Sequence, residues 1–241
     1  MPNLYINGKR IKDVYNADNI HFKKIKNADG VVIWNRSGLP NIYQEVEYIQ
    51  ADGNQYLDSE YAFINPELKI EFKYMKTVTT GSNPFGVDRP EDGGRRMHGH
   101  IFSNNLYTGD GGRTINIPDE SQKVGKIFEG SVQIIGTTTS DQIAILTLNG
   151  KSQTFLNSSS GFLFEGTQFS DYILATRSSS ASYLMSGRMY YLRFYDNTGA
   201  LVRNFVSCRR KSDNVVGMYD TVMRKFHTNL GTGAIVAGPD V

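Results

Sequence analysis

One segment, residues 188–206, constrains the fold more than any other part of this sequence. It contains two runs of strand-forming residues, 188–195 and 201–206, separated by the turn-forming sequence Asp-Asn-Thr-Gly. Successive side chains of a strand point to opposite faces, and Asn, Asp and Gly favour tight turns. The segment therefore predicts an antiparallel hairpin with one apolar face and one face of mixed aromatic and arginine side chains.

The predicted hairpin assigns each side chain to a face by simple alternation. On the first arm the two sets are Tyr190, Leu192 and Phe194 against Met189, Tyr191, Arg193 and Tyr195. On the second arm they are Val202, Asn204 and Val206 against Leu201, Arg203 and Phe205. A chain built from such hairpins buries one face of each sheet and can offer the other face to a ligand.

Similar alternation recurs along most of the chain. It is cleanest at 67–74, where two sets take opposite faces: Leu68, Ile70, Phe72 and Tyr74 against Glu67, Lys69, Glu71 and Lys73. Further strands are predicted at 43–61 around Asp52-Gly53, and at 84–87, 97–102, 113–117, 127–135, 142–148, 151–156, 171–176, 214–219 and 224–228. No segment favours a helix of three turns or more. The sequence predicts an all-β chain folded as a sandwich of two sheets.

The first 38 residues form a distinct module in this interpretation. Asn7-Gly8 predicts a hairpin over 4–15, and a turn at 27–30 predicts a second one over 20–34. Up to residue 36 the chain holds seven Lys or Arg against three Asp, a balance of +4. Two small hairpins bury too little apolar surface to be stable alone. We therefore divide the chain into a hairpin attachment module, 1–38, and a main domain, 39–241.

Several classes of protein are excluded by the composition. Cys208 is the only cysteine among the 241 residues, which rules out an internal disulfide or a cysteine-based zinc site, and we expect its side chain to be buried. The sequence has no apolar run of membrane-spanning length, and its first twenty residues lack the apolar stretch of a signal peptide. Because of the missing apolar run, we expect no membrane insertion. Basic residues form no concentrated stripe, so we also expect no nucleic-acid binding.

Three blocks of sequence resemble one family. Residues 43–58 resemble the opening strands of the concanavalin A-like, laminin-G-like jelly-roll domains common in bacteriophages and gut bacteria. Residues 187–206 resemble the penultimate hairpin of that family, and residues 211–233 resemble its closing segment. Together the blocks frame residues 41–238. The resemblance implies a two-sheet antiparallel jelly roll preceded by the hairpin module.

The first module is similar to short β-hairpin leaders of phage virion proteins, through Tyr5–Tyr15 and the Val-Ile-Trp sequence that ends at Trp34. The resemblance implies a non-catalytic binding module on the surface of a phage particle that recognises host-surface carbohydrate. Residues 1–38 would contact other virion proteins, and the exposed strand edges suggest a homo-oligomer or a larger assembly. The alternative is a structural protein that decorates a capsid or tail and contacts only other virion proteins.

Glycoside hydrolases share the fold that this resemblance implies, so pairs of carboxylates are candidate catalytic residues. Glu45 and Glu47 lie two apart on one predicted strand, and Glu67 and Glu71 lie four apart on a solvent-facing one. Carboxylates about 7 Å apart match the spacing of glycosidase acids. However, the related hydrolases carry an Asp between two Glu at alternating positions, and this sequence does not reproduce that motif. We expect no enzyme and no catalytic residues, with a glycoside hydrolase kept as a second alternative.

Metal binding is also not expected. His98 and His100 would share one face of a strand, but His21 and His227 are remote in sequence and a transition-metal site usually needs a third ligand. The sequence around Asp52 fails as an EF-hand because Leu57 replaces the required glycine. We predict no cofactor, while a calcium ion held by the loop residues Asp88, Asp92 and Asp110 stays open.

The candidate glycan surface combines aromatic side chains with polar groups that can bond to sugar hydroxyls. One group of candidates falls in 85–107 and comprises Phe85, Asp88, Arg95, Arg96, His98, His100, Asn104 and Tyr107. The other group lies on the predicted hairpin and comprises Tyr191, Arg193 and Tyr195. The alternative is that Tyr191 and Tyr195 pack under a loop and that the arginines are merely solvated.

Overall fold

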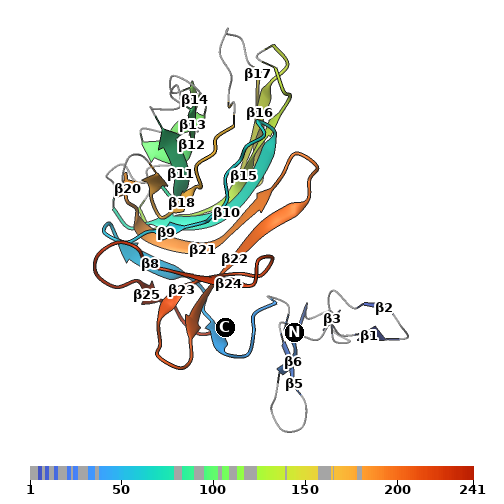
Figure 1. Cartoon of the computed structure of the whole chain (residues 1–241), viewed down its shortest axis with the longest axis vertical. Helices are drawn as coiled ribbons and strands as arrows, with labels where there is room; N and C mark the ends of the chain where they lie inside the picture. Colours follow the sequence, from blue (N-terminus) through green and yellow to red (C-terminus); the bar gives the residue numbers. More distant parts are fainter. Residues whose placement is uncertain are drawn as a thin grey trace.

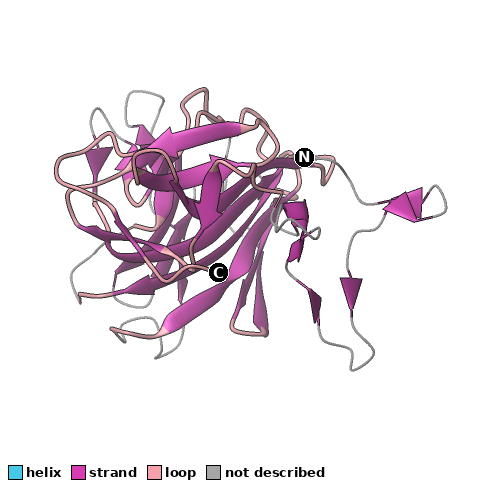
Figure 2. Cartoon of the chain, turned by 90° about the horizontal axis from the view of Figure 1, so that it is seen from below, coloured by secondary structure: helices cyan, strands magenta, loops and turns pink. Residues whose placement is uncertain are grey.

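The regular secondary structure of the described residues is entirely β-strand, and almost all of its strand pairs are antiparallel (Figures 1 and 2). The computed structural model describes 38–78, 83–89, 95–102, 105–108, 113–116, 124–138, 140–156, 164, 166–177 and 181–241, and six short strands before residue 36. Within 1–37 and 88–123 only the backbone of the strands is described. None of these residues lies in a helix, and so none could cross a membrane as one. The all-β prediction is confirmed.

Two sheets make up the main domain. The larger has eleven strands and follows the order β17-β16-β15-β10-β21-β22-β23-β24, with β7, β8 and β25 joined to its side. The smaller has eight strands and follows the order β14-β13-β12-β11-β18-β9, with β19 and β20 beside β11. Figure 1 shows the smaller sheet facing the strands β10, β15 and β16 across the core.

The larger sheet comprises β7 (Tyr43–Glu45), β8 (Ile49–Asp52), β10 (Leu68–Lys76), β15 (Ile127–Ile135), β16 (Ile143–Leu148), β17 (Lys151–Leu156), β21 (Ser186–Tyr195), β22 (Leu201–Arg210), β23 (Val216–Asp220), β24 (Lys225–Thr228) and β25 (Val236–Ala237). The smaller comprises β9 (Leu57–Asp58), β11 (Phe85–Arg89), β12 (Arg95–Phe102), β13 (Asn105–Thr108), β14 (Arg113–Asn116), β18 (Tyr172–Ile173), β19 (Thr176–Arg177) and β20 (Ala181–Ser182).

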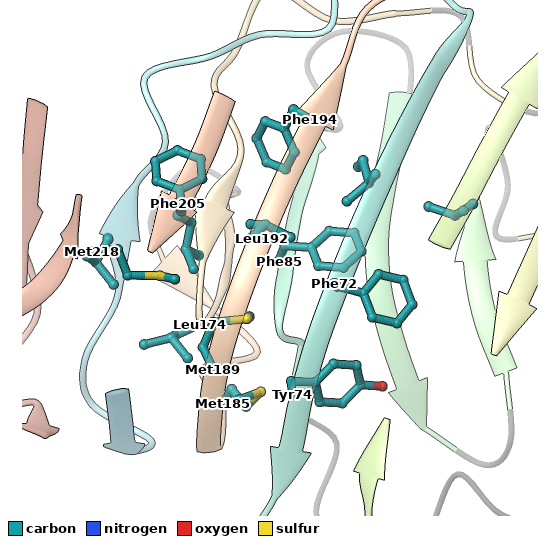
Figure 3. Close-up of a cluster of buried hydrophobic side chains, with 14 of the residues drawn as sticks. Phe72, Tyr74, Phe85, Leu174, Met185, Met189, Leu192, Phe194, Phe205 and Met218 are labelled. Atoms are coloured by element: carbon teal, nitrogen blue, oxygen red, sulfur yellow. The ribbon is translucent and has the colours of Figure 1, made fainter. Parts of the chain in front are cut away.

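Alternating apolar side chains fill the space between the sheets, as the sequence predicted for 67–74. The side chains buried from β10 are Leu68, Ile70, Phe72 and Tyr74. Phe72 packs against Phe85 of the smaller sheet with ring centroids 5.5 Å apart (Figure 3). The opposite face of β10 carries Lys69, Glu71 and Lys73, which remain partly exposed. This second face of the larger sheet, turned away from the core, is called the outer face below.

The predicted hairpin at 188–206 exists as β21 and β22, but simple alternation fails at its centre. Lys73 of β10 pairs with Tyr191 and the next residue, Tyr74, pairs with Met189, so Tyr190 is an extra residue in the strand. Such a β-bulge reverses the face on which side chains lie beyond it. Met189, predicted on the face of Tyr191, is therefore buried in the core, and Tyr190 joins Tyr191 on the outer face. Both assignments from the sequence were wrong.

The arms of this hairpin separate at the bulge. Tyr191 pairs with Val206, but two residues earlier Met189 pairs with Ile49 of β8, and beyond the fork Cys208 of β22 pairs with Glu45 of β7. Residues 43–52 thus fill the gap between the arms. The tail, residues 236–241, pairs with the opposite edge of 43–52: β25 pairs with β8, and Asp240 forms an isolated bridge with Val46. We call this junction the fork.

The first module contains three strand pairs: β1 (Tyr5–Ile6) with β2 (Lys9–Arg10), β3 (Val14–Tyr15) with β4 (His21–Phe22), and β5 (Lys24–Lys26) with β6 (Val32–Asn35). The first pair encloses Asn7-Gly8, and the third encloses the turn predicted at 27–30. The second pair was not predicted. None of the described strands of this module pairs with the two large sheets. The division at 38/39 remains a prediction.

Candidate ligand-binding site

A groove crosses the outer face at the fork. It is open to solvent and has a volume of about 560 Å³. Its walls come from β7 and the turn after it, β10, β15, β21, β22 and the end of the tail, and they are formed by Glu45, Val46, Glu47, Lys73, Glu129, Tyr190, Tyr191, Arg193, Asn204, Val206 and Val241. We call it the fork groove. It combines aromatic rings with carboxylates, cations and an amide, the mixture expected of a site for a polar ligand with apolar faces.

The bulge gives the groove its two tyrosines. Without an extra residue, Tyr190 and Tyr191 would point to opposite faces. A bulge also interrupts the ladder of backbone hydrogen bonds, and here the buried hydroxyl of Ser207 lies 2.9 Å from the carbonyl of Met189 and 3.1 Å from that of Tyr190. Ser207 therefore offers its hydroxyl proton to the backbone carbonyls at the point where the bulge interrupts the ladder.

Tyr191 is fixed by an ionic network on one side of the groove. Its hydroxyl donates to Glu129 at 3.1 Å, and the second oxygen of Glu129 lies 3.1 Å from the ammonium of Lys73. Partial burial, followed by the nearby Glu129 carboxylate, raises the pKa of Tyr191 above its ordinary value. The phenol consequently stays protonated as a donor, with its ring held across the groove.

Arg193 is fixed in a similar way. Its guanidinium lies 4.5 Å from the centre of the Tyr191 ring, donates to Asn204 at 3.1 Å and lies 3.4 Å from Glu71. Burial alone would raise the pKa of Glu71, but hydrogen bonds from Lys69 and Tyr195 outweigh it, and the net pKa is lowered. Glu71 is thus ionised, and it neutralises Arg193 although it does not itself line the groove.

The third predicted residue of the hairpin, Tyr195, lies beside the groove and does not line it. Its hydroxyl donates to Glu71 at 2.9 Å, and Lys69 lies 5.4 Å from its ring centre. Burial and the bond to Glu71 raise the pKa of Tyr195. Through Glu71 it helps to position Arg193. Tyr191 and Tyr195 are both only partly buried, and the outer face between them carries the ion pair of Arg193 with Glu71.

The opposite wall of the groove carries carboxylates of a different kind. Glu45 is partly exposed and Glu47 is exposed, and neither side chain has a hydrogen-bond or ion-pair partner among the described residues. Next to them the ring of Tyr190 meets that of Tyr48 edge to face, with centroids 5.5 Å apart. This wall therefore offers carboxylate acceptors that no described residue uses.

The other predicted group of site residues lies elsewhere. Phe85 is 1% exposed and belongs to the core, so its ring cannot reach a ligand on the surface. Arg95, Arg96, His98 and His100 lie on β12, Tyr107 on β13 and Asp88 on β11, all in the smaller sheet; only their backbones are described, and Asn104 falls outside the described residues. The core separates this sheet from the outer face, so the structure does not bring the two predicted groups together.

The described residues contain few candidate metal ligands close together. Among residues whose side chains are described, no three His, Cys, Asp or Glu side chains converge on one point. His98 pairs with Tyr107 in the backbone register, while the side chains of His98, His100, Asp88, Asp92 and Asp110 fall outside the described part. His227 is buried and its Nδ1 lies 2.8 Å from the carbonyl of Asp58. The described residues therefore do not test the predictions for His98 and His100 or for a calcium ion at Asp88, Asp92 and Asp110.

Sequence reasoning found Tyr191 and Arg193 but missed most of the groove. Tyr190 was assigned to the core, and Glu45 and Glu47 were considered only as acids for hydrolysis. Lys73 of β10 pairs with Glu129 of β15 on one side and with Tyr191 of β21 on the other, and both pairings join residues more than 50 positions apart. A row of charged residues on the polar side of 67–74 was the available signal, since it predicts partners of opposite charge across neighbouring strands.

Comparisons with known proteins bear on the fold. No protein-family model matches the chain, and no curated protein matches its sequence. Among solved structures, the native heptameric SAP-like pentraxin from Limulus polyphemus is similar, with a TM-score of 0.51 and 13% sequence identity over 83% of this chain and 97% of the pentraxin chain. That likeness concerns the fold alone. The described part of the chain is therefore a two-sheet jelly-roll sandwich, as predicted from the sequence.

Proposed function

We propose that this protein is a non-catalytic, lectin-like binding module that recognises carbohydrate through the fork groove. The observation that carries the proposal is the bulge at Tyr190, which presents two adjacent tyrosines to solvent within one groove. Sugars bind through apolar C–H faces on aromatic rings and through hydroxyl groups on planar polar side chains. Tyr190 and Tyr191 provide the former, and Arg193, Asn204, Glu45 and Glu47 provide the latter.

The surroundings of the groove support recognition of a flexible, polar ligand. Tyr191 and Arg193 are held by Glu129, Glu71 and Asn204 before any ligand arrives. Preorganised side chains lose little conformational freedom on binding, which favours affinity. The groove is also open rather than enclosed, as a site for part of a long surface polysaccharide needs to be.

A glycan array tests this proposal. We expect the protein to bind a subset of glycans and to lose that binding in Tyr191→Ala. The control Tyr183→Asn removes a ring that is 52% exposed outside the groove, and asparagine tolerates the φ of 48° found there. Binding that survives Tyr191→Ala would remove the groove from consideration. Arg95→Ala, on the smaller sheet, then tests the other predicted group of residues.

The setting we propose is the surface of a phage particle, with residues 1–38 attaching the domain to other virion proteins and the particle presenting the groove to host carbohydrate. The resemblance of the first module to virion leaders supports this, together with its separate strand pairs. Immunogold labelling of purified particles tests it. If particles assemble without the protein and adsorb poorly, a role in host recognition is supported; a defect in assembly with normal adsorption favours the structural alternative.

One observation keeps hydrolysis as a second candidate. Glu45, Glu47 and Glu129 line the same groove, whereas Glu67 accepts a bond from the backbone of Gly136 and Glu71 neutralises Arg193. A glycosidase needs two carboxyl groups on either side of the cut bond. Reducing sugar released from a bound glycan, and lost in Glu47→Gln, would establish hydrolysis. Binding without release supports the non-catalytic module.

A further inference from the structure

We infer that the fork groove selects saccharides that carry a positive charge, such as chains of hexosamines with free, protonated amines, over neutral and acidic ones. The inference rests on the proposed function and names the class of its ligand. It follows from a difference between the two walls of the groove. On one wall every charge is matched within the protein, and on the other the charges are unmatched and negative.

The matched wall is formed by β15, β10 and β21. Lys73 lies 3.1 Å from Glu129, and Arg193 lies 3.4 Å from Glu71 and bonds to Asn204. An acidic sugar arriving here would have to displace carboxylates that already hold these cations. The wall can still bond to neutral hydroxyls through the remaining donors of Arg193 and the amide of Asn204.

The unmatched wall is formed by β7 and the turn that follows it. Glu45 and Glu47 both line the groove, and neither carboxylate has a described partner. Bonds between an ionised acceptor and a charged donor are about twice as strong as neutral ones. A protonated amine is the sugar substituent that matches two neighbouring carboxylates, whereas a uronate or phosphate would be repelled.

Two arginines of the neighbouring strands have partners of their own. Arg209 makes two bonds to Asp240, the shorter at 2.7 Å. Arg188 stacks on the ring of Tyr48 at 4.3 Å, donates to Gln50 and hydrogen-bonds to the hydroxyl of Tyr190, but it forms no ion pair with Glu45 or Glu47. No described lysine or arginine therefore neutralises Glu45 or Glu47. A ligand can place its amine at this wall while its ring lies on Tyr190 and Tyr191.

Isothermal titration calorimetry with four probes tests the inference, at mildly acidic pH where the amines of chitosan are charged. The probes are chitosan hexasaccharide, its N-acetylated counterpart chitin hexasaccharide, hexagalacturonate and tetralysine. We expect chitosan to bind, chitin to bind at least about tenfold more weakly because acetylation removes one charge-assisted bond per sugar, and hexagalacturonate not to bind. Tighter binding of chitin or hexagalacturonate than of chitosan overturns the inference.

Substitutions of Glu45 and Glu47 test whether the preference for chitosan comes from this wall of the groove. Glu47→Gln and Glu45→Gln should each weaken chitosan binding about tenfold, while Glu47→Asp, which keeps the charge, restores most of it. The control Glu60→Gln removes a carboxylate outside the groove, where Lys225 holds it at 2.6 Å, and should change nothing. Equal losses in Glu60→Gln and Glu47→Gln would mean nonspecific attraction and would overturn the inference.

Two further outcomes separate this inference from the function it rests on. If neutral or acidic glycans bind through Tyr191 while chitosan does not, the carbohydrate-binding proposal survives and the charge selection is wrong. If no saccharide of any charge binds, the proposed function itself fails. Tetralysine binding as tightly as chitosan would indicate a basic protein as the ligand, which also overturns selection of a sugar.

Discussion

The hydroxyl of Ser207 lies 3.1 Å from the backbone carbonyl of Tyr190, the extra residue of the bulge. Ser207 is buried on β22, and its own carbonyl accepts a bond from the amide of Val46 at the fork. One residue thus connects the bulge in β21, through its side chain, with the segment that separates the arms of the hairpin, through its backbone. Several properties of the groove depend on this contact.

Ser207→Ala should destabilise the protein and weaken binding together. The change removes the hydroxyl that donates at the bulge, where the contact with the Met189 carbonyl is buried, and it leaves almost no cavity; an unsatisfied buried acceptor costs about 1–3 kcal/mol. Urea unfolding measures the loss. Ser152→Ala is the matched control, because that hydroxyl bonds only to Thr147 on an exposed surface. Equal stability of the two variants would show that the bulge does not need Ser207.

Asp171→Asn should stabilise the protein at neutral pH. Both carboxyl oxygens of Asp171 are buried without a partner, and burial, then the charge of Asp58, raises its pKa well above the ordinary value. Asp58 itself lies 3.3 Å from Arg177. A raised folded-state pKa gives stability that is present below the unfolded pKa and is lost as pH rises through the folded pKa. The advantage of the variant should therefore grow as pH increases.

Asp213→Asn is the control for this prediction, and we expect the pH dependence of its stability to be opposite. Bonds from the Arg210 guanidinium lower the pKa of the exposed Asp213, so its contribution is present above the unfolded pKa and is lost as pH falls. Asp213→Asn should therefore cost stability at neutral pH and nothing in acid. Thermal unfolding of the three proteins from pH 3 to pH 8 measures both trends, and parallel curves for Asp171→Asn and wild type would contradict the first.

Leu39→Ala should expose Cys208. Leu39 is 1% exposed and packs on the outer face against Cys208 and Tyr219. Burial raises the pKa of the Cys208 thiol to about 12, so the wild-type thiol should resist alkylation until the protein unfolds. Removing the leucine should cost about 2–5 kcal/mol and accelerate labelling by iodoacetamide. Leu156→Ala, at an exposed leucine of β17, is the control that should leave labelling unchanged.

Removal of residues 1–38 should leave the sandwich folded and change its assembly. The chain from residue 39 keeps Leu39 and its contacts with Cys208, whereas removal up to residue 42 also deletes this leucine and should lower the unfolding midpoint. Circular dichroism follows folding, and light scattering follows mass. If the first module drives association, the full chain should be larger than a monomer and the shortened chain monomeric. The same subunit number in both would contradict an attachment role.

Much of the fold could be predicted from alternation because burial on one side of a sheet leaves a clear pattern. The buried side of 67–74 and the turn after Tyr195 were predicted correctly for this reason. Met189 and Tyr190 were misplaced because a bulge reverses the pattern at a point where both neighbours are large and apolar or aromatic. Alternation carries no information about where an extra residue is inserted.

The candidate site was harder to predict because its walls come from distant parts of the chain. Tyr191 and Arg193 could be found on the hairpin alone, but Glu47 reaches them only because 43–52 fills the fork. Phe85 was included as an exposed ring although it packs on Phe72. Strand pairing over such separations depends on tertiary packing and not on the local sequence.

The position of 43–52 between β21 and the tail 236–241 also has a kinetic consequence. During synthesis the wall that holds Glu45 and Glu47 has no neighbour on one edge until residues 236–241 have emerged from the ribosome, nearly two hundred positions later. Contacts between segments so distant form slowly, because much of the chain must be ordered before they can close. The groove is therefore completed last, and a nascent or newly unfolded chain cannot hold a ligand before the rest of the sandwich is in place.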